Sequence, residues 1–186
     1  MKHKNVLSVQ NKVIIIFGGC GLLGTEFGKH LLSEKAKICI ADLSLLKFNK
    51  NYRTYIKKFK DKLFFSKVDV LNKQSIDKCI GLTKKKFKKN IDVIINASAM
   101  NAPFDKKFNK AQFSSIENYP IKLWKKSLDI NLTGALLIAQ LAIREFSKSK
   151  RGHLINIGSN YGLVAPDQSI YKENGKQKFY KPADYI

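Results

Sequence analysis

The sequence has few cysteines and no long hydrophobic run. Its three cysteines, Cys20, Cys39 and Cys79, are widely spaced, form no CxxC pair and have no histidine nearby at metal-ligand spacing. We therefore expect neither a disulfide framework nor a metal site. No apolar run is longer than that from Val13 to Phe17, far short of the roughly 20 residues of a membrane span. The run also does not look like the core of a signal peptide, so we expect a protein of the reducing cytoplasm with no membrane partner.

Acidic residues and arginines are also scarce. The 186 residues include 14 acidic and 35 basic side chains, a formal net charge of +21, and just three of the basic ones are arginine. Recognition of phosphates and guanine edges favours the planar fork of arginine over lysine. The lysines are scattered along the chain beside 20 Ile and 14 Asn, residue types whose codons are rich in A and T. We favour composition bias over a binding surface, and expect no more than non-specific affinity for nucleic acid.

Short apolar runs alternate with longer amphipathic stretches along the chain. Strands are predicted at Val13–Phe17 and at residues 38–41, 63–68, 91–96 and 153–157; helices are predicted at Leu22–Ser33 and at residues 44–60, 75–88 and 121–147. This alternation predicts right-handed βαβ crossovers and a parallel sheet covered on both faces. The expected fold class is α/β, a Rossmann-like, doubly wound parallel sheet, with residues 1–186 in one domain. Residues 97–119 and 160–184 show no clear period and are predicted to be loops.

Two of the predicted helices have apolar residues at helical spacing. In the first, Leu23, Phe27 and Leu31 recur every four residues and should share one face. In the long helix the same pattern is expected for Trp124, Leu128, Leu132, Ala135, Ala139, Ala142 and Phe146.

A glycine-rich turn follows the first strand and opens the first helix. Glycines at positions 18, 21 and 24 permit a tight turn, close approach of a pyrophosphate and close packing of helix on strand, and Gly28 extends that groove. The helix N-terminus adds a favourable potential for anions. The strand before the turn and the helix after it are the context that a dinucleotide site requires. The cofactor-binding residues expected here are Gly18, Cys20, Gly21, Leu22, Leu23 and Gly24.

Asp42 ends the second predicted strand, 18 residues beyond Gly24. A carboxylate at this position can accept hydrogen bonds from both ribose hydroxyls of an adenosine and would repel a 2′-phosphate. The alternative is that Asp42 caps the following helix, a position for which Ser44 competes. We favour the ribose role, so the expected cofactor is NAD rather than NADP.

With these motifs the sequence resembles the short-chain dehydrogenases/reductases over essentially its whole length. Val68, Asp69 and Val70 resemble the Asp-Val motif of that family, whose carboxylate meets the adenine amino group. Residues 96–99, including Asn96, Ala97 and Ser98, stand where the family has Asn-Asn-Ala-Gly, although the second Asn and the Gly are replaced here. The resemblance adds Asp69, Val70, Asn96, Ala97 and Ser98 to the expected cofactor site.

The resemblance also implies three catalytic residues. Asn131 lies in a segment, Asn131 to Gly134, that resembles the family's Asn-x-x-Gly, whose Asn holds a water of the proton relay. Ser159 follows a strand as the catalytic serine does, and Tyr185 resembles the tyrosine of Tyr-x-x-x-Lys. In the family a hydride moves between substrate and nicotinamide while the tyrosine exchanges a proton with the substrate oxygen, which the serine holds.

Two departures from the family pattern are informative. Ser159 and Tyr185 lie 26 residues apart, where the family commonly has about a dozen, so residues 160–184 contain an insertion. Together with residues 100–103 and 117–120, this insertion resembles the flagellin modification protein A branch, which implies an amino sugar derivative, free or nucleotide-linked, as the small-molecule substrate.

The second departure is that the sequence ends one residue after Tyr185, so the lysine expected four residues later is absent. The resemblance implies that this lysine lowers the pKa of the tyrosine. An unperturbed phenol titrates near pH 10, so without the lysine Tyr185 would lose the tuned pKa that general acid–base catalysis needs. We expect a truncated family member that is inactive alone, with oligomer contacts only in a longer version. The alternatives are a non-catalytic NAD-binding module and a basic polyanion-binding protein.

Overall fold

The computed structural model describes residues 8–100, 115–178, 180 and 181. The chain divides into two compact units. The first comprises residues 1–98 and 134–157, and the second comprises residues 99–133 and 158–186.

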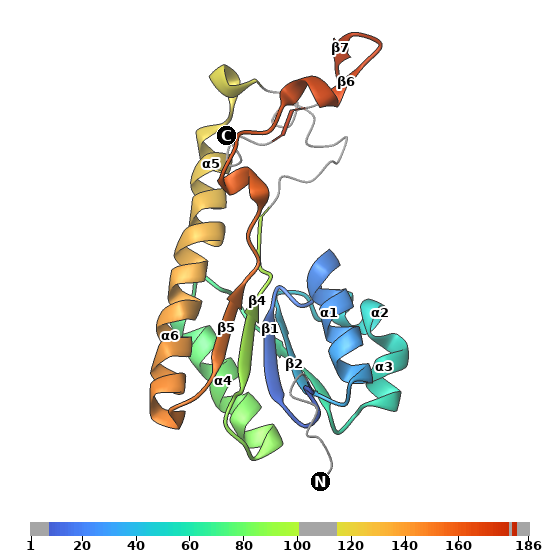
Figure 1. The fold of residues 1–186 in the computed structure, drawn as a ribbon, viewed down its shortest axis with the longest axis vertical. Helices are drawn as coiled ribbons and strands as arrows, with labels where there is room; N and C mark the ends of the chain where they lie inside the picture. Colours follow the sequence, from blue (N-terminus) through green and yellow to red (C-terminus); the bar gives the residue numbers. More distant parts are fainter. Residues whose placement is uncertain (1–7, 101–114, 179, 182–186) are drawn as a thin grey trace. The chain divides into compact units, whose positions relative to one another are not determined.

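The first unit contains a parallel five-stranded sheet (Figure 1). Its strands are β1 (Val13–Phe17), β2 (Lys37–Asp42), β3 (Leu63–Lys67), β4 (Val93–Asn96) and β5 (His153–Asn156), in the order β3-β2-β1-β4-β5. The order reverses between β1 and β4, which is the switch point of a doubly wound sheet. The predicted fold class is confirmed, and each predicted strand is present within two residues of its expected bounds.

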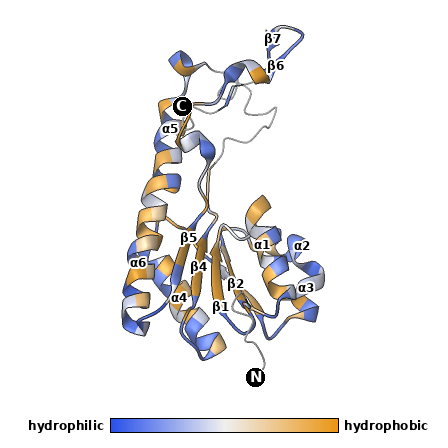
Figure 2. Ribbon diagram, in the orientation of Figure 1, coloured by the Kyte–Doolittle hydropathy of each residue, from blue (hydrophilic) through white to orange (hydrophobic). Residues whose placement is uncertain are grey.

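Helices cover both faces of this sheet (Figure 1). Helices α1 (Leu22–Ser33), α2 (Leu45–Asn51) and α3 (Arg53–Lys58) lie on one face, and α4 (Lys73–Phe87) and α6 (Gly134–Ser149) lie on the other. Figure 2 shows the apolar character of the strands between them.

Side chains of β1 alternate between the two layers of the core. Ile14 and Ile16 pack toward α1, α2 and α3, whereas Ile15 and Phe17 pack toward α4 and α6. Because both faces of β1 are covered, all five of its residues are buried, which explains its uninterrupted apolar sequence.

The face of α1 that meets the sheet differs in part from the predicted one. Gly24, Thr25, Gly28 and Leu32 are the buried residues of α1, while Leu23 is half exposed. Phe27 and Leu31 of the predicted face do pack against the core, partly buried, but the fully buried positions are mostly small residues, which allow the helix backbone to approach the strands closely.

The helix predicted at residues 44–60 is divided into α2 and α3. Ser44 caps α2 by accepting a hydrogen bond from the Lys47 backbone N–H at 3.2 Å. The break falls at Tyr52, whose φ of −109° and ψ of 14° are not helical and whose side chain is fully buried.

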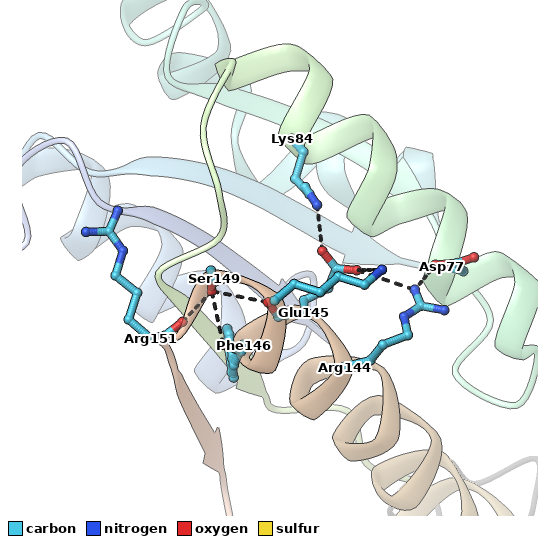
Figure 3. Close-up of polar contacts among 8 residues, drawn as sticks. Asp77, Lys84, Arg144, Glu145, Phe146, Ser149 and Arg151 are labelled. Atoms are coloured by element: carbon cyan, nitrogen blue, oxygen red, sulfur yellow. Dashed lines mark hydrogen bonds and ion pairs between the residues drawn. The ribbon is translucent and has the colours of Figure 1, made fainter.

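Ion pairs join α4 to α6 (Figure 3). The carboxylate of Glu145, almost completely buried, lies 2.6 Å from the ammonium group of Lys84, and Arg144 pairs with both Asp77 and Glu145. At the end of α6 the Ser149 hydroxyl donates to the backbone oxygen of Arg151. The ion pairs of Lys84 with Glu145 and of Asp77 with Arg144 hold α6 beside α4 on the same face of the sheet.

The second unit contains α5 (Ile121–Leu128), a π-helical turn at Asp129–Thr133 and 3₁₀ turns at Ile116–Asn118, Asn160–Gly162 and Gln168–Tyr171. Strands β6 (Lys172–Glu173) and β7 (Lys176–Gln177) form a two-stranded antiparallel hairpin (Figure 1). The predicted loop at residues 160–184 therefore has local structure where it is described.

The apolar face predicted along residues 121–147 is wrong in part. A π-helical turn has more residues per turn than an α-helix, so the four-residue repeat does not stay on one face through it. Leu132 is 64% exposed, and the buried apolar residues of α6 are Ile138, Leu141 and Ala142.

One helical segment in the described part of the chain, Ile121–Ser149, is long and apolar enough to cross a membrane by length and composition. Its C-terminal part, α6, contributes Ile138, Leu141 and Ala142 to the core cluster on the sheet. A core helix passes the same test, so this is weak evidence for a membrane span.

Candidate cofactor site

The glycine-rich turn between β1 and α1 has a backbone that other residues could not adopt without rearrangement. Gly18 has a φ of +69°, and a Cβ on it would lie 2.6 Å from the backbone N of Ser98 and the backbone O of Ala97. A Cβ on Gly24 would lie 2.3 Å from the backbone O of Gly18. The turn therefore lies against the segment that follows β4, which brings Gly18, Ala97 and Ser98 together as expected for one site.

The carboxylate of Asp42 is part of this turn. Its Oδ2 accepts a hydrogen bond from the Cys20 backbone N–H at 2.9 Å, and its Oδ1 accepts one from the Ser44 backbone N–H at 3.3 Å. Because Ser44 is the N-cap of α2, Asp42 does not cap that helix. The structure joins Asp42 to the glycine turn directly.

Cys20 is buried beneath the turn, with 4% of its surface exposed. Burial, aided by the nearby Asp42 charge, raises the pKa of its thiol to about 12. The thiol is therefore protonated at neutral pH and is no nucleophile. Its thiol packs beneath the turn and donates weakly to the Ser44 backbone O at 3.9 Å, while its backbone N–H donates to Asp42.

The N-terminus of α1 opens to solvent beside the turn. Gly21 is its N-cap and has no side chain that could accept a hydrogen bond from the first turn of α1. The N–H groups of a first turn lack intrahelical partners, and they attract anions. Leu22 is 86% exposed. A cavity of about 380 Å³ lies here, lined by Cys20, Gly21, Leu22, Thr25, Glu26, Lys29 and Asn51.

The ends of β3 and β4 place further expected residues in the same unit. Asp69 is exposed after β3, and its carboxylate accepts a hydrogen bond from the Leu71 backbone N–H at 2.9 Å; Val70 is half-buried. Asn96, at the end of β4, is buried. Its Oδ1 accepts from the Ser98 backbone N–H at 3.1 Å and its Nδ2 donates to Asn156 Oδ1 at 3.1 Å.

Asn156 was not singled out from the sequence. It stands opposite Asn96 in the register of β4 and β5, so the pairing follows from sheet topology. A polar residue inside an otherwise apolar strand is the signal that could have revealed it.

Asn131 lies in the second unit, within the π-helical turn. Its side-chain amide exchanges two hydrogen bonds with the Met100 backbone, accepting at 2.8 Å and donating at 3.2 Å, and it also donates to the Ser127 hydroxyl at 3.0 Å. π-Helical turns are frequent at functional sites. The sequence did not reveal the π turn or Ser127, because both depend on the local helix geometry.

Ser159 is exposed and begins a 3₁₀ turn, where its hydroxyl accepts a hydrogen bond from the Tyr161 backbone N–H at 3.2 Å. Tyr185 and residues 101–103 lie outside the described residues. The structure thus groups the expected cofactor residues in the first unit and Asn131 and Ser159 in the second.

A family model described as short chain dehydrogenase matches residues 12–172. The chain is 28% identical over 174 residues to the post-translational flagellin modification protein A of Campylobacter coli, covering 91% of this chain and 63% of that protein.

Solved structures show the same fold. A short chain dehydrogenase from Bacillus anthracis superposes with a TM-score of 0.74 at 24% identity, covering 86% of this chain and 60% of that one. An NAD⁺-bound xylitol dehydrogenase superposes with a TM-score of 0.73 at 20% identity, covering 85% and 56%. The chain therefore spans roughly 60% of the length of the relatives it matches.

Proposed function

The chain belongs to the short chain dehydrogenase family, and from this premise we propose that it forms the NAD(H)-binding part of an oxidoreductase. The reaction is hydride transfer between nicotinamide and an alcohol or carbonyl carbon. The observation that carries the proposal is the Asp42 carboxylate held at the glycine turn by the Cys20 backbone N–H at 2.9 Å. A carboxylate there is placed to accept the ribose hydroxyls of an adenosine.

The same arrangement supports NAD(H) over NADP(H). A 2′-phosphate next to Asp42 would bring two negative charges together, and the turn from Gly18 to Gly24 contains no lysine or arginine to offset them. The similar xylitol dehydrogenase has NAD⁺ bound, which agrees with this preference.

The residues present fit a dinucleotide. The first-turn N–H groups of α1 would hold the pyrophosphate, and Asp42 would hold the ribose. Asp69 and Val70 would meet the adenine, while Asn96, Ala97 and Ser98 would line the path beyond Gly18. When bound, the nicotinamide supplies or accepts the hydride.

For catalysis we propose the roles that the family pattern implies. Ser159 would hydrogen-bond the substrate oxygen, Tyr185 would exchange a proton with it, and Asn131 would position a water that leads to solvent. Because the chain covers 63% of the flagellin modification relative, we propose that turnover needs the rest of that length and that this chain alone is inactive.

For the substrate we propose a sugar derivative, because the relative from Campylobacter coli is a flagellin modification protein. For the compartment we propose the cytoplasm, since all three cysteines are free and buried. Oligomer contacts are proposed for a longer version only.

An extension experiment tests the catalytic proposal. The C-terminal part of the flagellin modification relative, starting at its matching tyrosine, is joined after Asp184 so that the tyrosine keeps position 185. We expect NAD-dependent turnover of an amino sugar from a panel of free and nucleotide-linked derivatives, with loss of activity on Tyr185→Phe. Turnover by the unextended chain that depends on Tyr185, or none by a folded, NADH-binding extended chain, contradicts the proposal.

A further inference from the structure

The junction between α2 and α3 places a buried phenol behind the glycine turn. Tyr52 is fully buried, and its hydroxyl lies 2.9 Å from the Gly19 backbone O, with the Gly24 O at 3.2 Å and the Thr25 O at 3.4 Å. A hydroxyl has one proton to donate, and the nearest acceptor is Gly19. The hydroxyl is therefore enclosed by carbonyl oxygens of the turn and the first turn of α1.

Gly28 makes room for this contact. A Cβ on Gly28 would lie 2.3 Å from the Tyr52 hydroxyl oxygen. Glycine at position 28 thus leaves room for the phenol of Tyr52, which lies between α2 and α3, and this explains the glycine without a ligand. The sequence predicts a different role for Gly28, in which it extends the groove beside the glycine-rich turn.

The neighbouring Asn51 contacts the same turn. Its Nδ2 donates to the Cys20 backbone O at 3.1 Å and to Thr25 Oγ1 at 3.1 Å. Thr25 Oγ1 in turn donates to the Gly19 backbone O at 3.4 Å. Two consecutive carbonyls of the turn, those of Gly19 and Cys20, are thus bound by side chains from one junction.

These contacts reach Asp42 through a single peptide unit. The Gly19 carbonyl and the Cys20 N–H belong to the same planar peptide group and point in opposite directions. Tyr52 binds its oxygen at 2.9 Å, and Asp42 Oδ2 accepts from its N–H at 2.9 Å. The orientation of that plane therefore links the Tyr52 hydroxyl to the Asp42 carboxylate, the group proposed above to hold the ribose.

We infer that Asn51 and Tyr52 are positioning residues for the cofactor. They hold the peptide groups 19–20 and 20–21 so that carbonyl oxygens point away from the ligand and Asp42 keeps its orientation toward the ribose. This inference rests on the NAD(H) site proposed above.

The test compares Tyr52→Phe with Tyr55→Phe, the same chemical change one helical turn further on, where the ring stacks against Phe59. NADH is titrated against the 186-residue chain at a temperature well below the melting transition of each variant. Because Tyr52 does not touch the ligand, the NADH Kd should rise by the cost of reordering the freed turn on binding, with one hydrogen bond setting a ceiling of about fivefold for Tyr52→Phe, and should not change for Tyr55→Phe. Asn51→Ala should behave as Tyr52→Phe does.

A double-mutant comparison separates positioning from general stability. If Tyr52 acts through Asp42, Tyr52→Phe should change the Kd less in an Asp42→Asn background than in the unsubstituted chain. An unchanged Kd in Tyr52→Phe, or the same fold-change in both backgrounds, overturns the inference.

Amide exchange of the Cys20 N–H provides a measurement that needs no cofactor. We expect faster exchange in Tyr52→Phe and no change in Tyr55→Phe, because the peptide group that carries this N–H loses its anchor. Equal exchange in both variants overturns the inference. Failure of the unsubstituted chain to bind NADH contradicts the proposed function, and the exchange rates still decide whether the phenol holds the peptide.

Discussion

Replacement of Gly24 by alanine tests the packing of the glycine turn, with Gly81→Ala as the matched control. Both glycines lie inside helices, α1 and α4. A Cβ on Gly81 would have nothing within 4 Å, whereas a Cβ on Gly24 would lie 2.3 Å from the Gly18 backbone O and 2.8 Å from the Gly19 Cα.

The two substitutions should therefore have opposite effects on stability. Alanine in a helix is more favourable than glycine by about 0.5–1 kcal/mol, and Gly81→Ala should gain that amount. At Gly24 the clash is with backbone atoms, which no rotamer change can relieve, and overpacking of this kind costs about 1–3 kcal/mol. The helix gain is the same in both variants and cancels. Gly24→Ala should therefore be less stable than Gly81→Ala by the cost of the clash, about 1–3 kcal/mol.

Urea unfolding followed by far-ultraviolet circular dichroism measures this difference as a shift in midpoint. NADH binding by Gly24→Ala should also weaken, because the turn must move to admit the methyl group. Equal stability of the two variants would refute the account of the turn as a closely packed structure that requires glycine.

The remaining predictions concern a helix end, the cysteines and nucleic acid. Lys88, the C-cap of α4, has a φ of +50°, so Lys88→Gly should raise the free energy of unfolding by up to about 1 kcal/mol; a lower urea midpoint would contradict this. All three cysteines are buried, so a thiol reagent at pH 8 should label the native protein slowly and the unfolded protein at once. Burial raises the pKa of the Cys20 thiol from 9.0 to about 12, so between these pH values the thiol is protonated in the folded protein and ionised in the unfolded one. The free energy of unfolding should therefore fall as pH rises from 9.0 toward 12; an unchanged melting temperature across that range would contradict this prediction. Duplex DNA should bind weakly, without sequence preference, and release by about 0.2 M salt; selective binding at that salt would favour a polyanion-binding role.

The sheet and its first helix could be predicted because their signals are local. The apolar run Val13–Phe17 and the helix Leu22–Ser33 match the observed bounds, since burial on two faces and a glycine-rich turn each leave a pattern in consecutive residues. The βαβ rule predicts a parallel sheet with right-handed crossovers, but it does not by itself fix the order β3-β2-β1-β4-β5.

The features that sequence analysis missed depend on contacts between distant residues. The break at Tyr52 exists because its phenol is buried against a turn about thirty residues earlier, with Gly19 as partner. The pairing of Asn96 with Asn156 joins two strands. Helical periodicity gave the face of α1 only in part: Phe27 and Leu31 pack against the core, whereas Leu23 is half exposed and Gly24 and Gly28 are buried, because close packing against the strands selects small residues.

The π-helical turn around Asn131 was missed for a different reason. An apolar four-residue repeat runs through residues 121–147 and predicts one regular helix. The structure interrupts it at Asp129–Thr133, where the Asn131 amide bonds to the Met100 backbone. The spacing of apolar residues along a helix cannot reveal a hydrogen bond between Asn131 and the backbone of Met100.

The most direct test of the central claim is a titration of the unextended chain with NADH and NADPH, repeated with Asp42→Asn. The account predicts tighter binding of NADH than of NADPH. Asp42→Asn should weaken NADH about tenfold, since hydrogen bonds to a charged acceptor contribute about 1.5–3 kcal/mol, and should narrow or reverse the preference because the repulsion of a 2′-phosphate is removed. Equal or tighter binding of NADPH by the unsubstituted chain would contradict the assignment of Asp42 and of the glycine turn as an NAD(H) site.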